Sequence, residues 1–86
     1  MYVYILSSEI KNWHYVGFTK NVENRIYEHN KGNVTSTKSY KPFKLIFVQV
    51  VSDTKIARQL EKFLKIRYNK EVVLELISRG GGMADA

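Results

Sequence analysis

Three side chains that can act on a phosphate group lie close together in one stretch of the sequence: Tyr15, Arg25 and His29. A guanidinium holds two phosphate oxygens at once, and an imidazole titrates near neutral pH. Because Arg25 and His29 are four residues apart, a helix would place one above the other, beside the phenol at the end of a preceding strand. Such a surface can bind a phosphate, take a proton and stabilise charge. Our working hypothesis is therefore phosphodiester hydrolysis assisted by a metal ion.

Glu61 is the best candidate ligand for that ion. Mg²⁺ keeps several of its waters and often takes only one or two protein carboxylates, so a single acid is sufficient. The residue lies four positions after Ala57, at the edge of an apolar helical stripe. The alternative is an exposed partner of Lys65 at i,i+4, and spacing alone favours this alternative.

The other candidates also have ordinary structural interpretations. Arg25 can be a surface arginine paired with Glu28, and His29 can be an ordinary residue of a helix face. Tyr4 and Tyr15 can be core aromatics. For Tyr15 to act as a general base, nearby cations or metal-bound water must make its phenol more acidic. The order of these residues along the chain carries more weight than any one of them.

Composition limits the classes of protein. The 86 residues are enough for one small domain, and the absence of cysteine excludes disulfides and thiolate zinc sites. No apolar run approaches the ~20 residues that span a membrane, so we expect a cytoplasmic protein without membrane contact. Fourteen Lys and Arg against eight Asp and Glu give a formal charge of +6, which favours nucleic acid as partner. The alternative is a basic protein whose charge is incidental.

The first half of the sequence predicts a β-hairpin followed by a helix. Residues 2–6 are short, β-branched and aromatic, which is typical of a strand, and residues 13–17 form the returning strand. Asn21 is a suitable N-cap for a helix over residues 22–31, and Gly32 is suited to end that helix.

The second half predicts one strand and two helices. The apolar run 43–51 has few polar positions, so we expect a central strand covered on both faces. A helix capped by Ser52 or Asp53 would continue to about Tyr68. Asn69 would cap a last helix, in which the following residues face inward: Val72, Val73, Leu76 and Ile77.

The order β-β-α-β-α-α predicts an α/β fold, a small three-stranded antiparallel sheet flanked by helices. We expect one domain over residues 1–78 and a disordered, glycine-rich tail over residues 79–86.

Residues 32–42 form a polar, basic connection between the first helix and the third strand. Loops of this length are usually functional or mobile. Lys38 and Lys41 in the loop, together with Lys20 in the turn before the first helix, are candidates for contacts with a phosphate backbone. The alternative for the loop is an ordinary solvated connection.

The motifs, in their order along the chain, resemble the signature of the GIY-YIG nuclease superfamily. Tyr2-Val3-Tyr4, ten intervening residues and Tyr15-Val16-Gly17 are similar to its paired triplets. Residues 21–29 look like its helix motif, and residues 57–65 look like its metal-binding helix. The match extends over roughly residues 1–77 and most resembles the small stand-alone bacterial members.

The resemblance implies a role for each matching residue. Tyr4 and Tyr15 correspond to the signature tyrosines, the second as the base that activates water, and Gly17 lets the backbone turn close to the substrate. Arg25 corresponds to the arginine that binds the scissile phosphate. His29 occupies a position that is His or Tyr in relatives.

Glu61 corresponds to the sole metal ligand of the family. The resemblance therefore favours a metal ligand over the exposed partner of Lys65 that spacing alone favours. The sequence also departs from the family at three positions. Tyr2 stands where the signature has glycine, and Phe18 stands where the excision-repair nuclease has a phosphate-binding lysine. Asn69 lies too near Glu61 to match a late asparagine of some relatives.

The resemblance therefore implies an endonuclease that uses one Mg²⁺ or Mn²⁺ ion and acts on DNA, or on RNA. We expect it to be directed by structure rather than sequence, in DNA repair or processing, with a homodimer or partner protein adding specificity. One alternative is a nucleic-acid-binding module with little or no catalysis. Another is a protein-interaction module, which would not bind DNA at physiological salt.

Overall fold

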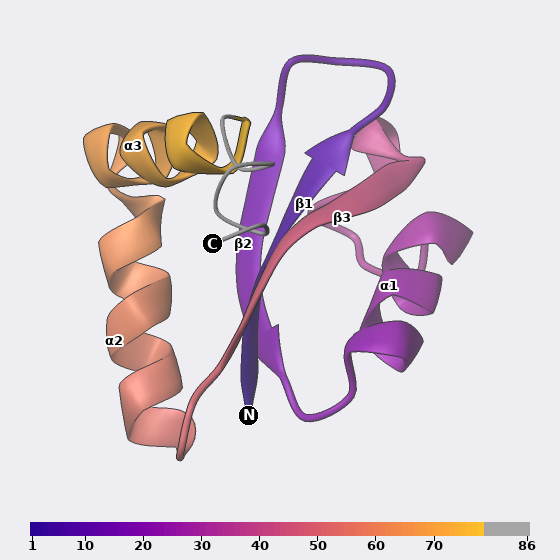
Figure 1. The fold of residues 1–86 in the computed structure, drawn as a ribbon. Helices are drawn as coiled ribbons and strands as arrows, with labels where there is room; N and C mark the ends of the chain where they lie inside the picture. Colours follow the sequence, from indigo (N-terminus) through magenta and orange to yellow (C-terminus); the bar gives the residue numbers. More distant parts are fainter. Residues whose placement is uncertain (79–86) are drawn as a thin grey trace.

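The computed structural model describes residues 1–78, which form a three-stranded antiparallel sheet with helices on both faces (Figure 1). In chain order the elements are β1 (Tyr2–Ser8), β2 (His14–Thr19), α1 (Val22–Lys31), the 3₁₀ turn η1 (Lys38–Tyr40), β3 (Phe43–Val50), α2 (Thr54–Lys65) and α3 (Arg67–Ser78). The predicted α/β fold and its order β-β-α-β-α-α are confirmed. The tail that we expected to be disordered lies outside the described residues.

The first strand, β1, is the centre of the sheet, between β2 and β3. The prediction that the strand over residues 43–51 is central is therefore wrong, because β3 is an edge strand. Val48 and Val50 on β3 are 41% and 63% exposed. An apolar run indicates that a segment is suited to a sheet, but it does not say which strands pair on its two sides.

Alternation along β1 assigns its side chains to the two faces of the sheet. Val3 and Ile5 lie in the core between the sheet and α2, with Ala57 of that helix. Tyr4 and Leu6 lie in the second core, on the face that α1 covers. Figure 1 shows α1 on one side of the sheet, and α2 and α3 on the other. The phenol of Tyr4 therefore belongs to the α1 face.

Both ends of α1 follow the predicted capping chemistry. The Asn21 side chain accepts a hydrogen bond from the backbone N–H of Asn24 at 3.0 Å. Gly32 ends the helix in the left-handed region, with φ of 84°. These local interactions fix the start of α1, and hence which of its residues face the sheet.

The junction of α2 and α3 differs from the prediction. The first of these helices ends at Lys65 rather than near Tyr68, and α3 begins at Arg67. Asn69 therefore does not cap α3; instead its side chain donates to the backbone carbonyl of Phe63 at 3.0 Å. This bond satisfies a carbonyl at the C-terminal end of α2.

Only part of the apolar side of α3 reaches the core. Val73 and Leu74 pack against it. Val72 and Leu76, which we expected to face inward, are exposed. No helix within residues 1–78 is long and apolar enough to cross a bilayer.

The connection between α1 and β3 is anchored rather than free. Tyr40 of η1 stacks on Trp13, with ring centroids 3.9 Å apart and planes 10° from parallel. Ser8 donates its hydroxyl to the Tyr40 carbonyl. Thr37, just before η1, is fully buried. The connection thus carries a polar side chain into the α1 face of the sheet.

Candidate active site

Gly17 makes room for two phenols on the α1 face. Tyr4 of β1 lies opposite Gly17 of β2 in the strand register. A Cβ on Gly17 would lie 2.7 Å from the Tyr4 hydroxyl and 2.9 Å from Cε2 of Tyr15, distances that side chains do not tolerate. The ring centroids of the two tyrosines are 6.2 Å apart. The glycine is therefore needed for close approach, and without it the tyrosine pair cannot keep this arrangement.

The first prediction concerns this contact. We expect Gly17→Ala to lower the free energy of unfolding by about 1–3 kcal/mol, because the new methyl group overpacks the tyrosines. Denaturant unfolding measures the loss. In the Gly17→Ala background, Tyr4→Phe removes the atom nearest to the methyl group and should recover part of the stability. An alanine variant as stable as the wild type would contradict the close contact.

Arg25 of α1 faces both tyrosines. Burial by itself would lower the pKa of the Arg25 guanidinium, but hydrogen bonding to Tyr4 and its contacts with Tyr15 raise the pKa overall. Glu28, the alternative partner of this arginine, accepts instead from the Asn33 side-chain amide at 2.8 Å. The structure thus places a permanent positive charge beside two hydroxyl groups.

Tyr4 is held as a neutral phenol. Burial raises the pKa of Tyr4 to about 12, although hydrogen bonding to Arg25 acts in the opposite direction. The side chain is 1% exposed. Because the phenol keeps its proton at neutral pH, Tyr4 is a poor general base and a good hydrogen-bond donor. Tyr15 is less buried and is the more accessible of the two.

His29 is a buried acceptor for the Tyr4 proton. Its Nε2 lies 3.1 Å from the Tyr4 hydroxyl, and its Nδ1 lies 2.8 Å from Oγ1 of Thr37. The Thr37 hydroxyl donates its only proton to the Val34 carbonyl at 3.3 Å, so Thr37 must accept from Nδ1–H. This leaves Nε2 to accept from Tyr4. The imidazole therefore orients the phenol and is not itself exposed to solvent.

Thr37 is the residue of this site that sequence reasoning missed. It lies in the polar stretch Val34-Thr-Ser-Thr-Lys38, where three hydroxyl residues look alike. Only the folded connection shows that Thr37 is buried against His29 while Thr35 and Ser36 are exposed. No local pattern in the sequence distinguishes them.

A second prediction tests this chain of hydrogen bonds. Thr37→Val leaves the His29 Nδ1–H buried without an acceptor, which should cost about 1–3 kcal/mol of unfolding free energy. Thr37→Ser should restore most of that loss. Imidazole ¹⁵N chemical shifts should show an Nδ1-protonated, neutral His29 in the wild type. An Nε2-protonated tautomer would contradict the assigned direction of the bonds.

A third prediction follows from the charge state of His29. Burial and the nearby Arg25 charge lower the pKa of His29 to about 4. Between pH 6.5 and 4 an unfolded histidine binds a proton that the folded protein excludes, so stability should fall as the pH is lowered through this window.

Thermal unfolding between pH 7 and 5 measures that fall. His29→Gln should flatten the dependence of the melting temperature on pH. His14, whose pKa is also lowered, by burial and by Lys70, provides the control: His14→Gln should keep most of the slope. If His29→Gln leaves the slope unchanged, the assignment of His29 as a neutral, buried imidazole is wrong.

Glu61 of α2 has the ion pair that its spacing predicts, while its role as a metal ligand stays a prediction. Its carboxylate pairs with the Lys65 ammonium at 3.7 Å, as i,i+4 spacing predicts, and its side chain is 20% exposed. Its charge also contributes to the raised pKa of Tyr4. The helix α2 packs against β2 and β1, on the face of the sheet opposite α1 (Figure 1).

The donor set around Glu61 fits a hydrated hard ion. Among residues 1–78 there is no group of three or more His, Cys, Asp or Glu side chains that could hold a metal. One carboxylate with its remaining positions filled by water is a common arrangement for Mg²⁺, and Mn²⁺ accepts the same oxygen ligands. Glu61 is thus the side chain here that would hold such an ion.

The three candidate lysines are all exposed: Lys20, Lys38 and Lys41. Lys41 also lies near the end of α1, since a Cβ on Gly32 would lie 3.3 Å from its ammonium nitrogen. A cation at this position is favourable, because the C-terminal end of a helix carries partial negative charge. Lys41 therefore lies where its charge also suits the C-terminal end of α1.

Comparison with known proteins places this arrangement in a family. Residues 1–73 match the model of the GIY-YIG catalytic domain. A UPF0213 protein of Syntrophus aciditrophicus is 35% identical over 91% of this chain and 90% of its own length. The UPF0213 protein YazA of Bacillus subtilis is 31% identical over 86% of this chain and 77% of its own length. No solved structure matches the chain.

The names of these relatives state no activity, whereas the domain model is that of a nuclease family. The model covers the hairpin, α1 and α2, and hence all five site residues that the sequence singled out: Tyr4, Tyr15, Arg25, His29 and Glu61. The chain belongs to the GIY-YIG family of nuclease domains.

Proposed function

We propose that this protein is an endonuclease that hydrolyses phosphodiester bonds in DNA with the help of one Mg²⁺ or Mn²⁺ ion. The observation that carries the proposal is the position of Arg25, whose guanidinium is held beside the two tyrosines. A phosphate bound there would be close to the carboxylate of Glu61, whose charge contributes to the raised pKa of Tyr4. Family membership supports the nuclease class.

The residues divide the work of hydrolysis. Arg25 binds two phosphate oxygens and neutralises the charge that develops on them. Tyr15 acts as a general base: after its own phenol proton has passed to solvent, its oxygen takes the proton from the attacking water. Tyr4, oriented by His29, fixes the guanidinium and the neighbouring phenol. A divalent ion held by Glu61 would neutralise charge at the leaving oxygen when bound.

We also propose the biological setting. The enzyme selects DNA by its shape rather than by its sequence, which suits a role in DNA repair or processing. We place this role in the cytoplasm, and we propose RNA as an alternative substrate. A homodimer or partner protein would supply sequence specificity. Lys20, Lys38 and Lys41 are proposed as contacts to the phosphate backbone, since all three are exposed.

The test is cleavage of end-labelled single-stranded, duplex and branched DNA, and of RNA, with Mg²⁺, Mn²⁺ or a chelator. We expect products with a divalent ion and none with the chelator. Preference for the branched DNA would support selection by structure. Cleavage that persists in the chelator would contradict the metal-dependent mechanism.

The charge of +6 favours a second candidate, a nucleic-acid-binding module without significant turnover. This candidate predicts salt-dependent binding of the same DNA and no products with any ion. Binding and cleavage measured on one preparation separate the two.

A further inference from the structure

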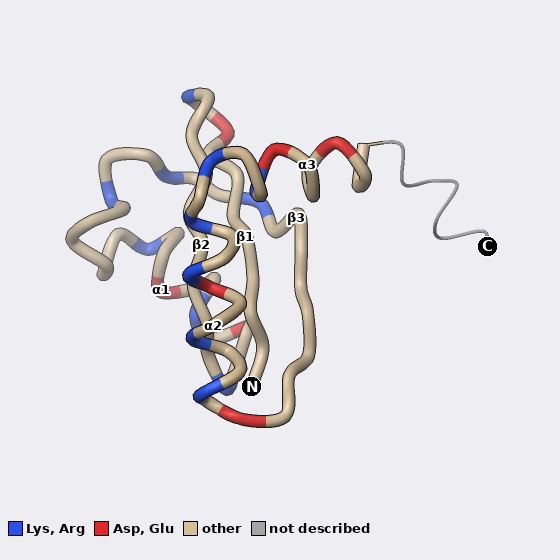
Figure 2. Tube along the Cα trace, turned by 90° about the vertical axis from the view of Figure 1, so that its left-hand side faces the viewer, with Lys and Arg blue, Asp and Glu red and all other residues tan. Residues whose placement is uncertain are grey.

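One side of α2 carries a continuous row of positive charge. Its four basic residues are spaced by three, four and three positions, which places them on one side of a helix: Lys55, Arg58, Lys62 and Lys65. Figure 2 shows the blue segments following one another along that side of α2. We call these four residues the α2 row.

The α2 row is largely uncompensated. Within residues 1–78, Lys55, Arg58 and Lys62 form no ion pair, and only Lys65 has an acidic partner, Glu61. Like charges three or four residues apart on a helix destabilise it by a few tenths of a kcal/mol per pair. A bound polyanion would turn that repulsion into attraction.

The row runs past the candidate metal ligand. Glu61 lies on α2 between the buried side of the helix, marked by Ala57 and Leu64, and the α2 row. An anion that lies along the row therefore passes Glu61 part of the way along α2. The row is about 15 Å long at ~1.5 Å per residue, which corresponds to about four phosphates along one strand of duplex DNA at ~3.4 Å each.

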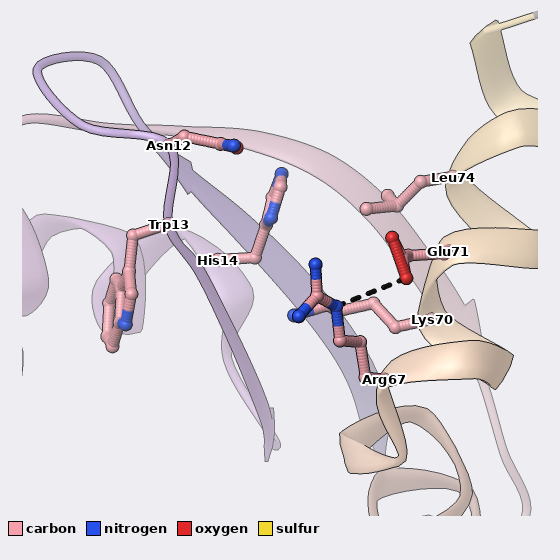
Figure 3. Close-up of a pocket in the computed structure, with 7 residues that line it drawn as sticks. All are labelled: Asn12, Trp13, His14, Arg67, Lys70, Glu71 and Leu74. Atoms are coloured by element: carbon pink, nitrogen blue, oxygen red, sulfur yellow. Dashed lines mark hydrogen bonds and ion pairs between the residues drawn. The ribbon is translucent and has the colours of Figure 1, made fainter.

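Beyond the C-terminal end of α2, the charge continues into a hollow of about 370 Å³ between the start of β2 and α3. Figure 3 shows the side chains of His14, Arg67 and Lys70 extending into the space between the two elements, whereas Trp13 points away. Arg67 pairs with Glu71 at 3.3 Å, so Lys70 is the cation of this hollow without a carboxylate partner among the described residues.

The imidazole of His14 adds a neutral polar group to the hollow. Burial and the nearby Lys70 lower the pKa of His14. At neutral pH it can therefore donate or accept a hydrogen bond without adding charge. Asn12 supplies an amide at the same rim. The Lys70 ammonium, with neutral donors beside it and an Arg67–Glu71 ion pair whose charges balance, is suited to one phosphate group.

We propose that the α2 row and this hollow form one track for the phosphate backbone of DNA, with the scissile phosphate beside Glu61. The proposal rests on the proposed function, since it extends the DNA site beyond Arg25 and the tyrosines. It assigns Arg58, Lys62 and Lys70 to phosphate contacts on the strand that passes the metal ligand.

The salt dependence of binding tests the track directly. The probe is a fluorescein-labelled DNA duplex of mixed sequence, measured by fluorescence anisotropy in a chelator so that no cleavage occurs. Each lost phosphate contact should reduce the slope of log Kd against log salt concentration by about 0.9. We expect this reduction for Lys62→Gln and for Lys70→Gln. The matched control is Lys44→Gln, which removes the same charge from an exposed position on β3.

The outcomes separate the track from the proposed function. If all three variants change the slope equally, or none does, the track is wrong, because only the overall charge matters or no contact is made. If Lys62→Gln and Lys70→Gln reduce the slope while Lys44→Gln does not, the track is supported. Cleavage by the wild type with Mg²⁺ or Mn²⁺, measured separately, decides whether the proposed nuclease function stands.

Discussion

Glu61→Gln is expected to reduce the single-turnover rate of DNA cleavage by about 10³-fold, which corresponds to roughly 4 kcal/mol of transition-state stabilisation. Glutamine keeps the size of the side chain but removes its negative charge. Within residues 1–78 no group of three or more His, Cys, Asp or Glu side chains offers an alternative metal site. A metal ion typically supplies several kcal/mol of charge stabilisation in the transition state.

The matched control for this prediction is Glu23→Gln, the same chemical change at an exposed position in the first turn of α1. It should cleave DNA within a few-fold of the wild-type rate. The DNA affinity of Glu61→Gln, measured in a chelator, should not fall, because the substitution removes a negative charge of the protein from beside the proposed DNA site. An unchanged cleavage rate in Glu61→Gln would show that Glu61 holds no catalytic ion.

Tyr15→Phe is the second change for which we expect a large effect, a loss of about 10²–10⁴-fold in the cleavage rate. The substitution removes one oxygen and keeps the ring, which lies 6.2 Å from Tyr4 and 4.8 Å from His29 between centroids. The fold should therefore survive. Binding of DNA should also survive, since Arg25 keeps its hydrogen bond to Tyr4.

Two controls make the Tyr15 prediction specific. Tyr27→Phe removes the same oxygen from an exposed tyrosine of α1 and should cleave at the wild-type rate. Tyr4→Phe should reduce the rate less than Tyr15→Phe, because Tyr4 keeps its proton and acts by orienting its neighbours. A larger loss of rate in Tyr4→Phe than in Tyr15→Phe would assign the proton transfer to Tyr4 and contradict the roles proposed for the two tyrosines.

The parts of the fold that the sequence predicted correctly depend on local chemistry. Asn21 caps α1 and Gly32 ends it, because both effects act within one helical turn. The hairpin that places Tyr4 opposite Gly17 follows from two short β-rich segments with a turn between them. Sequence order along the hairpin and α1 was therefore sufficient to predict which of their residues come together.

The predictions that failed depend on contacts between distant segments. The apolar composition of β3 does not reveal that β1 takes the central place. The break at Ile66 between α2 and α3 has neither glycine nor proline to mark it. Thr37 becomes part of the site through the fold of the connection, in which Tyr40 of η1 stacks on Trp13 and Thr37 contacts His29.

Glu61 shows a different limit of sequence reasoning. Its spacing predicted the ion pair with Lys65, and that ion pair is present. The resemblance to the family implied a metal ligand, which stays a prediction; the charge of Glu61 contributes to the raised pKa of Tyr4. The ion pair with Lys65 does not exclude that role, because the Glu61 side chain remains 20% exposed.

The central claim is that Tyr15 and Glu61, from opposite sides of the sheet, act as one catalytic unit. The most direct measurement compares single-turnover cleavage by Tyr15→Phe, by Glu61→Gln and by the double variant, with enzyme in excess and Mg²⁺ or Mn²⁺ present. Residues that act as a unit have strongly non-additive effects. We therefore predict that the double variant cleaves about as fast as the slower single variant. A double variant whose loss equals the product of the two single losses, or single variants that cleave like the wild type, would contradict the claim.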